Sequence, residues 1–355
     1  MVGTTGCRQT ACSTRSCREV DGRPRPHGGW NSYREAVTDA STPPVIDSPA
    51  FDDALDPSWV AGVVRTALDE DLGPEPGRDV TTQATVDAAA IGTADLVARA
   101  DGVVAGLVVV HEVLAQVAER FGLSAPTVTF VARDGDRVQR GQVLATIAGP
   151  TQALLVAERT MLNLASRASG VATHTRRWAD ELDGTGTLVL DTRKTTPGLR
   201  ALEKYAVRAG GGTNKRMGLF DVAMVKDNHV VAAGSVAAAV AAVRERFPDV
   251  AVQVEADTTE QAVEAVDAGA DFLLLDNMPT PVLAATVAAV RGRQGTPAAG
   301  VPGATVPAHV ELEATGNLTL DHAVEVAGTG VDYLSVGALT HSSPILDLAL
   351  DLRPA

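Results

Sequence analysis

The feature that most constrains the fold is a repeated alternation of two kinds of segment in the second half of the chain. Six short apolar runs recur there, at Thr187–Leu190, Val222–Val225, Val250–Val254, Phe272–Leu275, His309–Leu312 and Tyr333–Val336. Helix-like, alanine-rich segments separate several of them, namely Ser235–Phe247, Thr259–Ala268 and Thr280–Arg291. Strands that alternate with helices form parallel β/α units, and continuous apolar runs fit strands buried on both faces. We therefore expect an α/β fold with a parallel barrel, closed or partly open.

Polar residues follow each of these runs. They are Asp191-Thr-Arg-Lys194, Lys226-Asp-Asn-His229, Glu255-Ala-Asp257, Asp276-Asn277, Glu313-Ala-Thr-Gly316 and Gly337-Ala-Leu-Thr-His341. In a parallel barrel the carboxyl ends of all strands open on one face, which carries the active site. Asp and Asn are also ordinary turn residues. Six polar groups in succession, with cations, carboxylates and glycines among them, favour an active site over simple turns.

The residue types in these groups indicate the chemistry of the ligands. The fixed cations suit phosphates and carboxylates, and they are Arg193, Lys194, Lys215, Arg216 and Lys226. Two carboxylates, Glu255 and Asp276, suit ribose hydroxyls or a magnesium ion that bridges phosphates. Gly316 and Gly337 follow the last two strands, where barrels commonly bind a phosphate. The triplet at 210–212 fits a helix stop better than an anion loop.

The charge distribution supports an anionic ligand. The net charge of −14 argues against a general nucleic-acid binder. The segment from Arg193 to Lys226 nevertheless holds eight basic and two acidic residues, a local balance of +6. A solvated face with scattered ion pairs is the alternative reading of such a run.

The rest of the chain divides into three kinds of segment. Residues 1–50 are rich in Arg, Ser, Thr, Pro and Gly, so we predict disorder there. The spacing of Cys7, Cys12 and Cys17 does not match a zinc site. Helices and strands mix in residues 51–150, and a long helix is expected from 152 to 182. This helix carries a polar stripe at Arg159, Asn163 and Ser166. The stripe faces a partner or a ligand in one interpretation and the solvent in the other.

The sequence also predicts a soluble, cytoplasmic protein. No apolar run reaches the roughly 18 residues that would suggest a membrane span. The first residues are polar and basic, without the apolar stretch of a secretory signal.

Several motifs resemble those of quinolinate phosphoribosyltransferases, in order from about residue 55 to the end. The most specific is the ten-residue segment Asp191-Thr-Arg-Lys-Thr-Thr-Pro-Gly-Leu-Arg200. Dispersed matches accompany it: Glu70-Asp-Leu-Gly73, Asp79-Val-Thr-Thr82, Asp101-Gly-Val-Val-Ala-Gly106, Glu158-Arg-Thr-Met-Leu-Asn163, Ser169-Gly-Val-Ala-Thr173, Val225-Lys-Asp-Asn-His229, Leu275-Asp-Asn-Met278 and Ser335-Val-Gly-Ala-Leu-Thr-His341.

The resemblance implies an N-terminal α/β sandwich-like domain, at residues 51–162, and a C-terminal incomplete α/β barrel, at residues 163–341. Residues 342–355 are expected to pack on the first domain. The family's activity would join quinolinate to phosphoribosyl pyrophosphate with loss of carbon dioxide, a step of NAD synthesis. A homodimer is implied too, in which Arg159 reaches the partner's site, while a higher oligomer such as a hexamer stays open.

The resemblance also implies roles for individual residues. Lys194, Glu255 and Asp276 would be the catalytic residues. The quinolinate carboxylates would contact Arg193, Lys194, Arg216 and the residue at 215. Phosphoribosyl pyrophosphate and its magnesium ion would be surrounded by Lys194, Lys226, Glu255 and Asp276. The 5′-phosphate would lie near Thr315, Gly316, Gly337 and His341.

Two positions depart from the family's pattern. Lys215 stands where the family usually has histidine, and Thr315 stands where it has serine. Lysine keeps a cation but does not titrate near neutral pH as histidine does, so the details of quinolinate binding at this position are open. Two rivals remain: a related phosphoribosyltransferase for another aromatic acid, including a paralogue associated with molybdenum transport, and a barrel that senses a phosphorylated metabolite without turnover.

Overall fold

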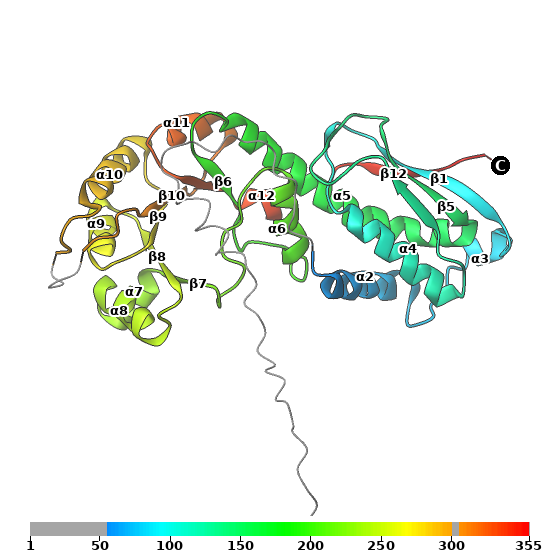
Figure 1. Ribbon diagram of the computed structural model, residues 1–355, viewed down its shortest axis with the longest axis horizontal. Coiled ribbons are helices and arrows are strands. Elements are labelled where there is room, and N and C mark those ends of the chain that lie inside the picture. The colour runs from blue at the N-terminus through cyan, green and yellow to red at the C-terminus, as the bar shows by residue number, and fades with distance from the viewer. Residues whose placement is uncertain (1–54, 300–304, 355) are drawn as a thin grey trace, which may run out of the picture.

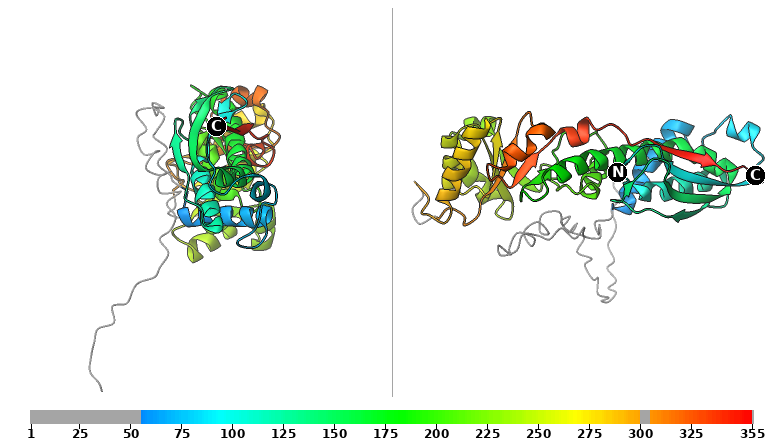
Figure 2. Two further views of the ribbon diagram at one scale, coloured as in Figure 1. Left: turned by 90° about the vertical axis from the view of Figure 1, so that its right-hand side faces the viewer. Right: turned by 90° about the horizontal axis from the view of Figure 1, so that it is seen from above.

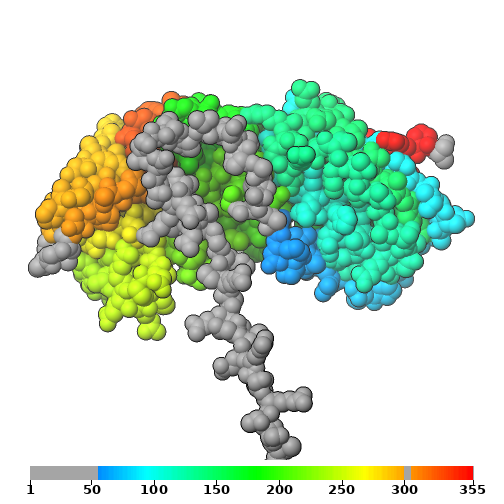
Figure 3. Space-filling view, viewed as in Figure 1, coloured from blue at the N-terminus to red at the C-terminus, as the bar shows by residue number. Residues whose placement is uncertain are grey.

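The computed structural model describes residues 55–299 and 305–354. The segment predicted to be disordered, 1–50, and the three cysteines lie outside the described residues. Two structural halves follow one another along the long axis of the molecule, and helix α5 (Thr151–Glu181) runs from one into the other (Figure 1). In the space-filling view the N-terminal half, in cyan, and the barrel, in yellow and orange, lie at opposite ends (Figure 3).

The N-terminal half is an antiparallel sheet covered by helices. Its strand order is β12-β1-β5-β3, with α2, α4 and α5 in contact with one another. Apolar residues of α4 such as Val113 and Leu114 are buried in the core, because they recur on one face of the helix. The bounds are α2 Pro57–Leu72, α3 Thr82–Thr85, β1 Ile91–Ala98, β2 Gly102–Val103, α4 Leu107–Phe121, β3 Thr127–Phe130, β4 Arg137–Val138, β5 Val143–Pro150 and β12 Leu348–Leu352.

The C-terminal half is a six-stranded parallel sheet with the order β6-β11-β10-β9-β8-β7. The two edge strands of this sheet, β6 and β7, are not paired with each other in the described residues, and a bridge from Leu190 to Thr213 lies beside β6 instead. The prediction of an incomplete parallel barrel is confirmed. The strand bounds are β6 Leu188–Leu190, β7 Val222–Val225, β8 Ala251–Ala256, β9 Phe272–Asp276, β10 Glu311–Thr315 and β11 Tyr333–Ser335.

Helices cover the outside of this sheet (Figures 1 and 2). The bounds are α6 Arg200–Ala209, α7 Asp227–Ala233, α8 Val236–Arg246, α9 Thr259–Asp267, α10 Thr280–Arg293, the 3-10 helix η1 Leu320–His322, α11 Ala323–Ala327 and α12 Ala338–His341. The predicted helix stop at 210–212 is confirmed, since α6 ends there and Gly211 has a φ of 86°. This φ is one that glycine adopts without strain.

The long helix α5 joins the two halves. Its residue Gly170 lies against the segment that leads to β12, and a Cβ there would come within 2.1 Å of the Pro344 carbonyl oxygen. Of the three polar positions expected to form one stripe, Arg159 and Asn163 are exposed but Ser166 is buried. The stripe is therefore shorter than predicted, because the C-terminal segment covers Ser166, whose carbonyl accepts from the Leu346 N–H.

None of the helices in the described part of the chain combines the length and the apolar character needed to cross a bilayer.

Candidate active site

The two carboxylates predicted from the sequence end neighbouring strands. Glu255 is next to last in β8, and Asp276 is the last residue of β9. In the register of the parallel sheet, Glu255 lies opposite Leu274, and Asp276 lies opposite Thr315 of β10. The barrel therefore brings Glu255, Asp276 and Thr315 to the carboxyl edge of three adjacent strands, as expected for an active-site face.

Lys194, Gly337 and His341 form a second group at this edge. Gly337 follows β11, and an added Cβ would lie 3.1 Å from His341 Nε2 and 3.2 Å from Lys194 Cδ. The hydroxyl of Thr340 donates to the Lys194 carbonyl oxygen at 2.9 Å. A glycine at 337 therefore leaves open the space between a cationic side chain and an imidazole, which suits an anionic group.

Gly316 makes a close approach between two strand ends. It has a φ of 97°, and a Cβ there would come within 2.1 Å of Asn277 Oδ1. The Asn277 N–H donates to the Thr315 carbonyl at 3.0 Å. The turns after β9 and β10 are thus held together, and only glycine fits at position 316.

The side chains of Arg193 and Arg216 are close enough for their positive charges to interact. The Nε of Arg193 is buried and has no hydrogen-bond partner among the described residues. Arg216 is 8% exposed and donates to the Val222 carbonyl at 3.0 Å. Burial lowers the pKa of Arg216, and the positive charge of Arg193 lowers that pKa further, whereas Asp221 and Glu313 oppose the shift. Two guanidinium groups held this way favour the binding of an anion between them.

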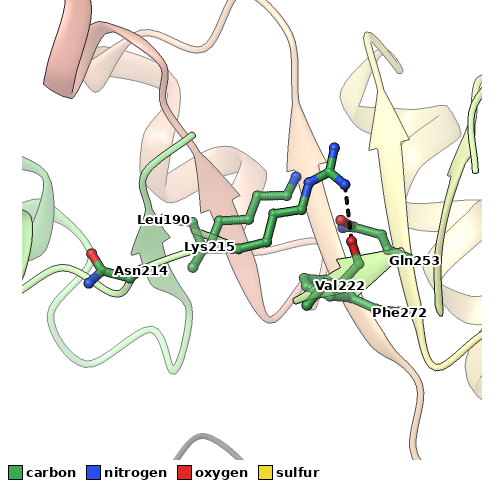
Figure 4. Close-up of a pocket in the computed structure, with 7 residues that line it drawn as sticks. Leu190, Asn214, Lys215, Val222, Gln253 and Phe272 are labelled. Atoms are coloured by element: carbon green, nitrogen blue, oxygen red, sulfur yellow. Dashed lines mark hydrogen bonds between the residues drawn. The ribbon is translucent and has the colours of Figure 1, made fainter. Parts of the chain in front are cut away.

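The Lys215 side chain lies among the residues that line a small cavity inside the barrel (Figure 4). Its Nζ lies 2.5 Å from Glu313 Oε1, and Gln253 donates to Glu313 Oε2 at 2.7 Å. Burial lowers the pKa of Lys215, an effect that Glu313 opposes and that Arg216 and Lys226 reinforce. Glu313 lies in the middle of β10, not after the strand as the sequence pattern predicted, because β10 extends to Thr315.

Lys226 and Glu255 form an ion pair at the mouth of the barrel. The Lys226 side chain is 44% exposed and that of Glu255 is 17% exposed. Lys226 also precedes α7, whose first residues are Asp227 and Asn228. A lysine that is half exposed can exchange this carboxylate for a phosphate ligand at small cost, since an exposed ion pair is worth only about 1 kcal/mol or less.

A buried ion pair holds the backbone at Lys215 in place. Lys204 on α6 and Asp191 after β6 are both buried, with Lys204 Nζ 2.5 Å from Asp191 Oδ1. The same carboxylate accepts from the Lys215 N–H at 2.8 Å. Burial raises the pKa of Asp191 to about 6, although Lys204 lowers it. Lys204 Nζ also donates to the Lys215 carbonyl at 2.9 Å, so the pair fixes the backbone of Lys215 at both its N–H and its carbonyl.

The interior cavity next to these cations is too small for a substrate. It has a volume of about 10 Å³, which is room for about one water molecule. Its lining is Leu190, Asn214, Lys215, Arg216, Val222, Gln253 and Phe272 (Figure 4). A ligand the size of an aromatic acid must therefore bind above it, at the mouth of the barrel.

Arg159 is the one predicted site residue that the chain does not bring near the others. It is exposed on α5, and its neighbour Thr160 contacts Asp71 at the end of α2. Eight residues of helix, or about 12 Å, separate it from Arg167, which contacts the segment after α12. Within its own chain Arg159 therefore lies in the N-terminal half, away from the strand ends.

The sequence analysis assigned no role to five residues that hold the cations in place. These residues are Asp191, Arg167, Glu203, Gln253 and Glu313. Their partners lie far away in the sequence, for example 98 residues apart for Lys215 and Glu313. The pattern of polar groups after the apolar runs contained Asp191 and Glu313, but it did not indicate that these two carboxylates pair with lysines inside the barrel.

Comparison with family models gives two matches. The model described as quinolinate phosphoribosyl transferase, C-terminal domain, matches residues 171–351. The model described as quinolinate phosphoribosyl transferase, N-terminal domain, matches residues 79–169. Together they span both halves of the structure.

Similar curated proteins and solved structures have corresponding names. Nicotinate-nucleotide pyrophosphorylase (carboxylating) of Mycobacterium leprae is 48% identical over 81% of this chain and 95% of its own length. Quinolinate phosphoribosyltransferase (decarboxylating) 1 of Nicotiana glauca is 35% identical over 82% of this chain and 81% of its own length. The structure of the nicotinate-nucleotide pyrophosphorylase from Francisella tularensis superposes with a TM-score of 0.75 at 32% identity, covering 84% of this chain and 98% of that one.

Proposed function

Because this chain belongs to the quinolinate phosphoribosyltransferase family, we propose that it transfers the phosphoribosyl group of phosphoribosyl pyrophosphate to quinolinate. The products are nicotinate mononucleotide, pyrophosphate and carbon dioxide, and the reaction serves de novo NAD synthesis. The enzyme is a pentosyltransferase.

The observation that carries this proposal is that two neighbouring guanidinium groups, Arg193 with a buried Nε that has no partner within the part of the chain that the structure describes and Arg216, accompany two carboxylates at the strand ends. Guanidinium groups bind carboxylates in a two-pronged geometry, and quinolinate offers two carboxylates on adjacent ring carbons. Glu255 and Asp276 suit the hydroxyls of a ribose. A dianionic aromatic acid and a phosphorylated ribose therefore match the two parts of the site.

The transfer step needs electrostatic stabilisation at both ends of the breaking bond. The pyridine nitrogen attacks the anomeric carbon as the bond to pyrophosphate breaks, and the ribose passes through an oxocarbenium-like state. Lys194 and Lys226 stabilise the charge that develops on the leaving pyrophosphate. Glu255 and Asp276 orient the ribose and stabilise its positive charge. No protein nucleophile is required.

Decarboxylation follows from the charge of the new pyridinium ring. The bond from ring carbon 2 to its carboxylate breaks, carbon dioxide leaves, and the electron pair stays on carbon 2 beside the positive nitrogen. A proton from solvent then adds to that carbon. The guanidinium groups of Arg193 and Arg216 hold the carboxylates until this step.

The donor set fits a magnesium ion that arrives with the substrate. In the described residues no three Asp, Glu, His or Cys side chains gather into a metal site. Glu255 and Asp276 supply two carboxylates on adjacent strands, and Mg²⁺ commonly binds one or two carboxylates together with phosphates and waters. These two residues would hold the ion, whose chemical contribution is to neutralise charge on the pyrophosphate.

A homodimer would complete the site. We propose that Arg159, exposed and remote from the strand ends of its own chain, contributes its guanidinium to the partner's quinolinate site. A cytoplasmic location remains a prediction from the sequence, to be checked by cell fractionation.

The test is release of carbon dioxide from quinolinate labelled at its 2-carboxylate. Release that requires phosphoribosyl pyrophosphate and magnesium as well as quinolinate would establish both substrates and the decarboxylation. Nicotinate, which lacks the 2-carboxylate, serves as the matched control substrate. Turnover of nicotinate without turnover of quinolinate would contradict the proposal in favour of another aromatic acid. Magnesium-dependent binding of phosphoribosyl pyrophosphate without any turnover would indicate a sensor.

A further inference from the structure

A group of buried polar residues lies directly behind the catalytic lysine, outside the substrate site. Arg167 on α5 and Glu203 on α6 form an ion pair in which the Arg167 Nε and Nη2 lie 3.0 and 2.7 Å from Glu203 Oε1. The Glu203 side chain is 0% exposed and that of Arg167 is 19% exposed. A buried charge pair of this kind is costly unless its remaining polar atoms are satisfied, so its other contacts show what it holds.

Glu203 holds the loop that carries Arg193 and Lys194. Its Oε2 accepts from the Thr196 N–H at 2.9 Å, and its Oε1 accepts from the Thr196 hydroxyl at 2.7 Å. Thr196 lies two residues after Lys194. The carboxylate therefore fixes both the backbone and the side chain of the loop just beyond the lysine.

Arg167 holds the opposite side of the same site. Its Nη1 donates to the Ser343 carbonyl at 2.9 Å, and its Nη2 donates to the Thr340 carbonyl. Thr340 belongs to α12, which follows Gly337, and its hydroxyl donates to the Lys194 carbonyl. One guanidinium thus connects the Lys194 loop, through Glu203, with the turn on the phosphate side.

We propose that Arg167 is a positioning residue for Lys194, acting through Glu203 and Thr196 on one side and through Thr340 on the other. This inference rests on the proposed function, because it assigns Lys194 to phosphoribosyl pyrophosphate. The planar fork of an arginine is needed, since the guanidinium reaches a carboxylate and two carbonyl groups at once. A lysine offers a point charge that cannot span all three.

The first experiment compares Arg167→Lys with the wild type. We expect kcat/KM for phosphoribosyl pyrophosphate to fall by about a hundredfold, the typical effect of misplacing a catalytic group by about 1 Å. Arg177→Lys is the matched control, since Arg177 is exposed on the same helix, and it should leave kcat/KM unchanged. A normal kcat/KM in folded Arg167→Lys overturns the proposal.

The second experiment separates positioning from a merely structural role by a double-mutant cycle with Lys194→Ala. If Arg167 acts through Lys194, adding Arg167→Lys to Lys194→Ala changes kcat/KM by no more than about twofold, the usual error of such cycles. If the loss of kcat/KM in the double variant equals the product of the losses in the two single variants, the proposal is overturned. If Arg167→Lys does not fold, Thr196→Val takes its place, with an expected loss of about tenfold for one hydrogen bond to a charged group.

A third experiment repeats the double-mutant cycle with a different quantity. The dissociation constant of phosphoribosyl pyrophosphate is measured for each variant by calorimetry in the presence of magnesium. This reading does not depend on turnover of quinolinate. A wild type that binds phosphoribosyl pyrophosphate but releases no carbon dioxide would contradict the proposed function alone. Full additivity in the binding cycle would contradict the positioning role alone.

Discussion

At Lys215, one carboxylate opposes several influences that lower the pKa of the ammonium group. Its ammonium group is buried, and two further cations, Arg216 and Lys226, lower its pKa. Glu313 opposes the shift from 2.5 Å, and Gln253 holds Glu313 in place. A lysine at the position where the family usually has histidine is therefore accommodated by a carboxylate inside the barrel.

This arrangement predicts an alkaline limit on activity. As pH rises through the lowered pKa, Lys215 loses its proton, and the positive charge that it places beneath the proposed quinolinate site disappears. The decline in kcat/KM for quinolinate should therefore begin at a pH lower than 10.5, the ordinary pKa of lysine. Lys215→Arg should keep activity to higher pH, because arginine stays protonated. Glu313→Gln should move the fall to lower pH, since it removes the group that raises the pKa. Identical pH–rate profiles for the three proteins would refute this assignment.

The same residue marks the limit of prediction from the sequence. The motif around Asn214 and Arg216 was sufficient to select Lys215 as a candidate. Its partner could not be selected, because Glu313 is 98 residues away and its strand was expected to end before it. Which side of a strand a carboxylate occupies depends on the register of the whole sheet, and a single sequence does not reveal that register.

Among the elements, β6 and α6 are joined by the buried pair of Asp191 and Lys204. The pair also fixes the backbone at Lys215. The folded state raises the pKa of Asp191 to about 6, above its ordinary value of 3.8. Between these values the folded protein binds a proton that the unfolded chain does not, so this group's contribution to stability is present at low pH and is lost as pH rises through 6.

Removing the lysine should make this dependence steeper. Lys204→Met leaves the Asp191 carboxylate buried without its cation, which typically costs about 3–5 kcal/mol of unfolding free energy. The pKa of Asp191 should then rise further, so the loss relative to the wild type should be larger at pH 8 than at pH 5. Urea unfolding at both pH values measures it, and Lys204→Met with Asp191→Asn is the control. An equal loss at both pH values would contradict the linkage.

The main elements were predictable where the pattern was long and apolar. Strands such as Phe272–Asp276 are buried on both faces, and α5 has a sustained helical period. The helix Asp227–Ala233 was not predicted, because its first residues resemble a polar turn. Strand ends were placed too early at Glu255 and Glu313, since charged residues inside a barrel are paired by distant groups that the local pattern does not show.

At the scale of the whole molecule, the separation of Arg159 from the other site residues constrains how a complete active site can assemble. The cations Arg193 and Arg216 lie at the barrel, whereas Arg159 is exposed on the N-terminal half of α5. The helix is continuous over 31 residues, so bending Arg159 back onto its own site would require breaking α5. A second copy of the chain is the simpler source of a third guanidinium for quinolinate.

A mixing experiment tests this arrangement. Arg159→Ala and Lys194→Ala should each be nearly inactive as homodimers, with losses of about a hundredfold or more if each removes one transition-state contact. Mixing the two under conditions that allow subunit exchange should restore up to about a quarter of wild-type activity, because half of the dimers are then hybrids with one intact site each. Mixing Arg193→Ala with Lys194→Ala is the control and should restore nothing, since both residues lie on one loop of one chain. If the first mixture also stays inactive while hybrids form, Arg159 does not act across the interface.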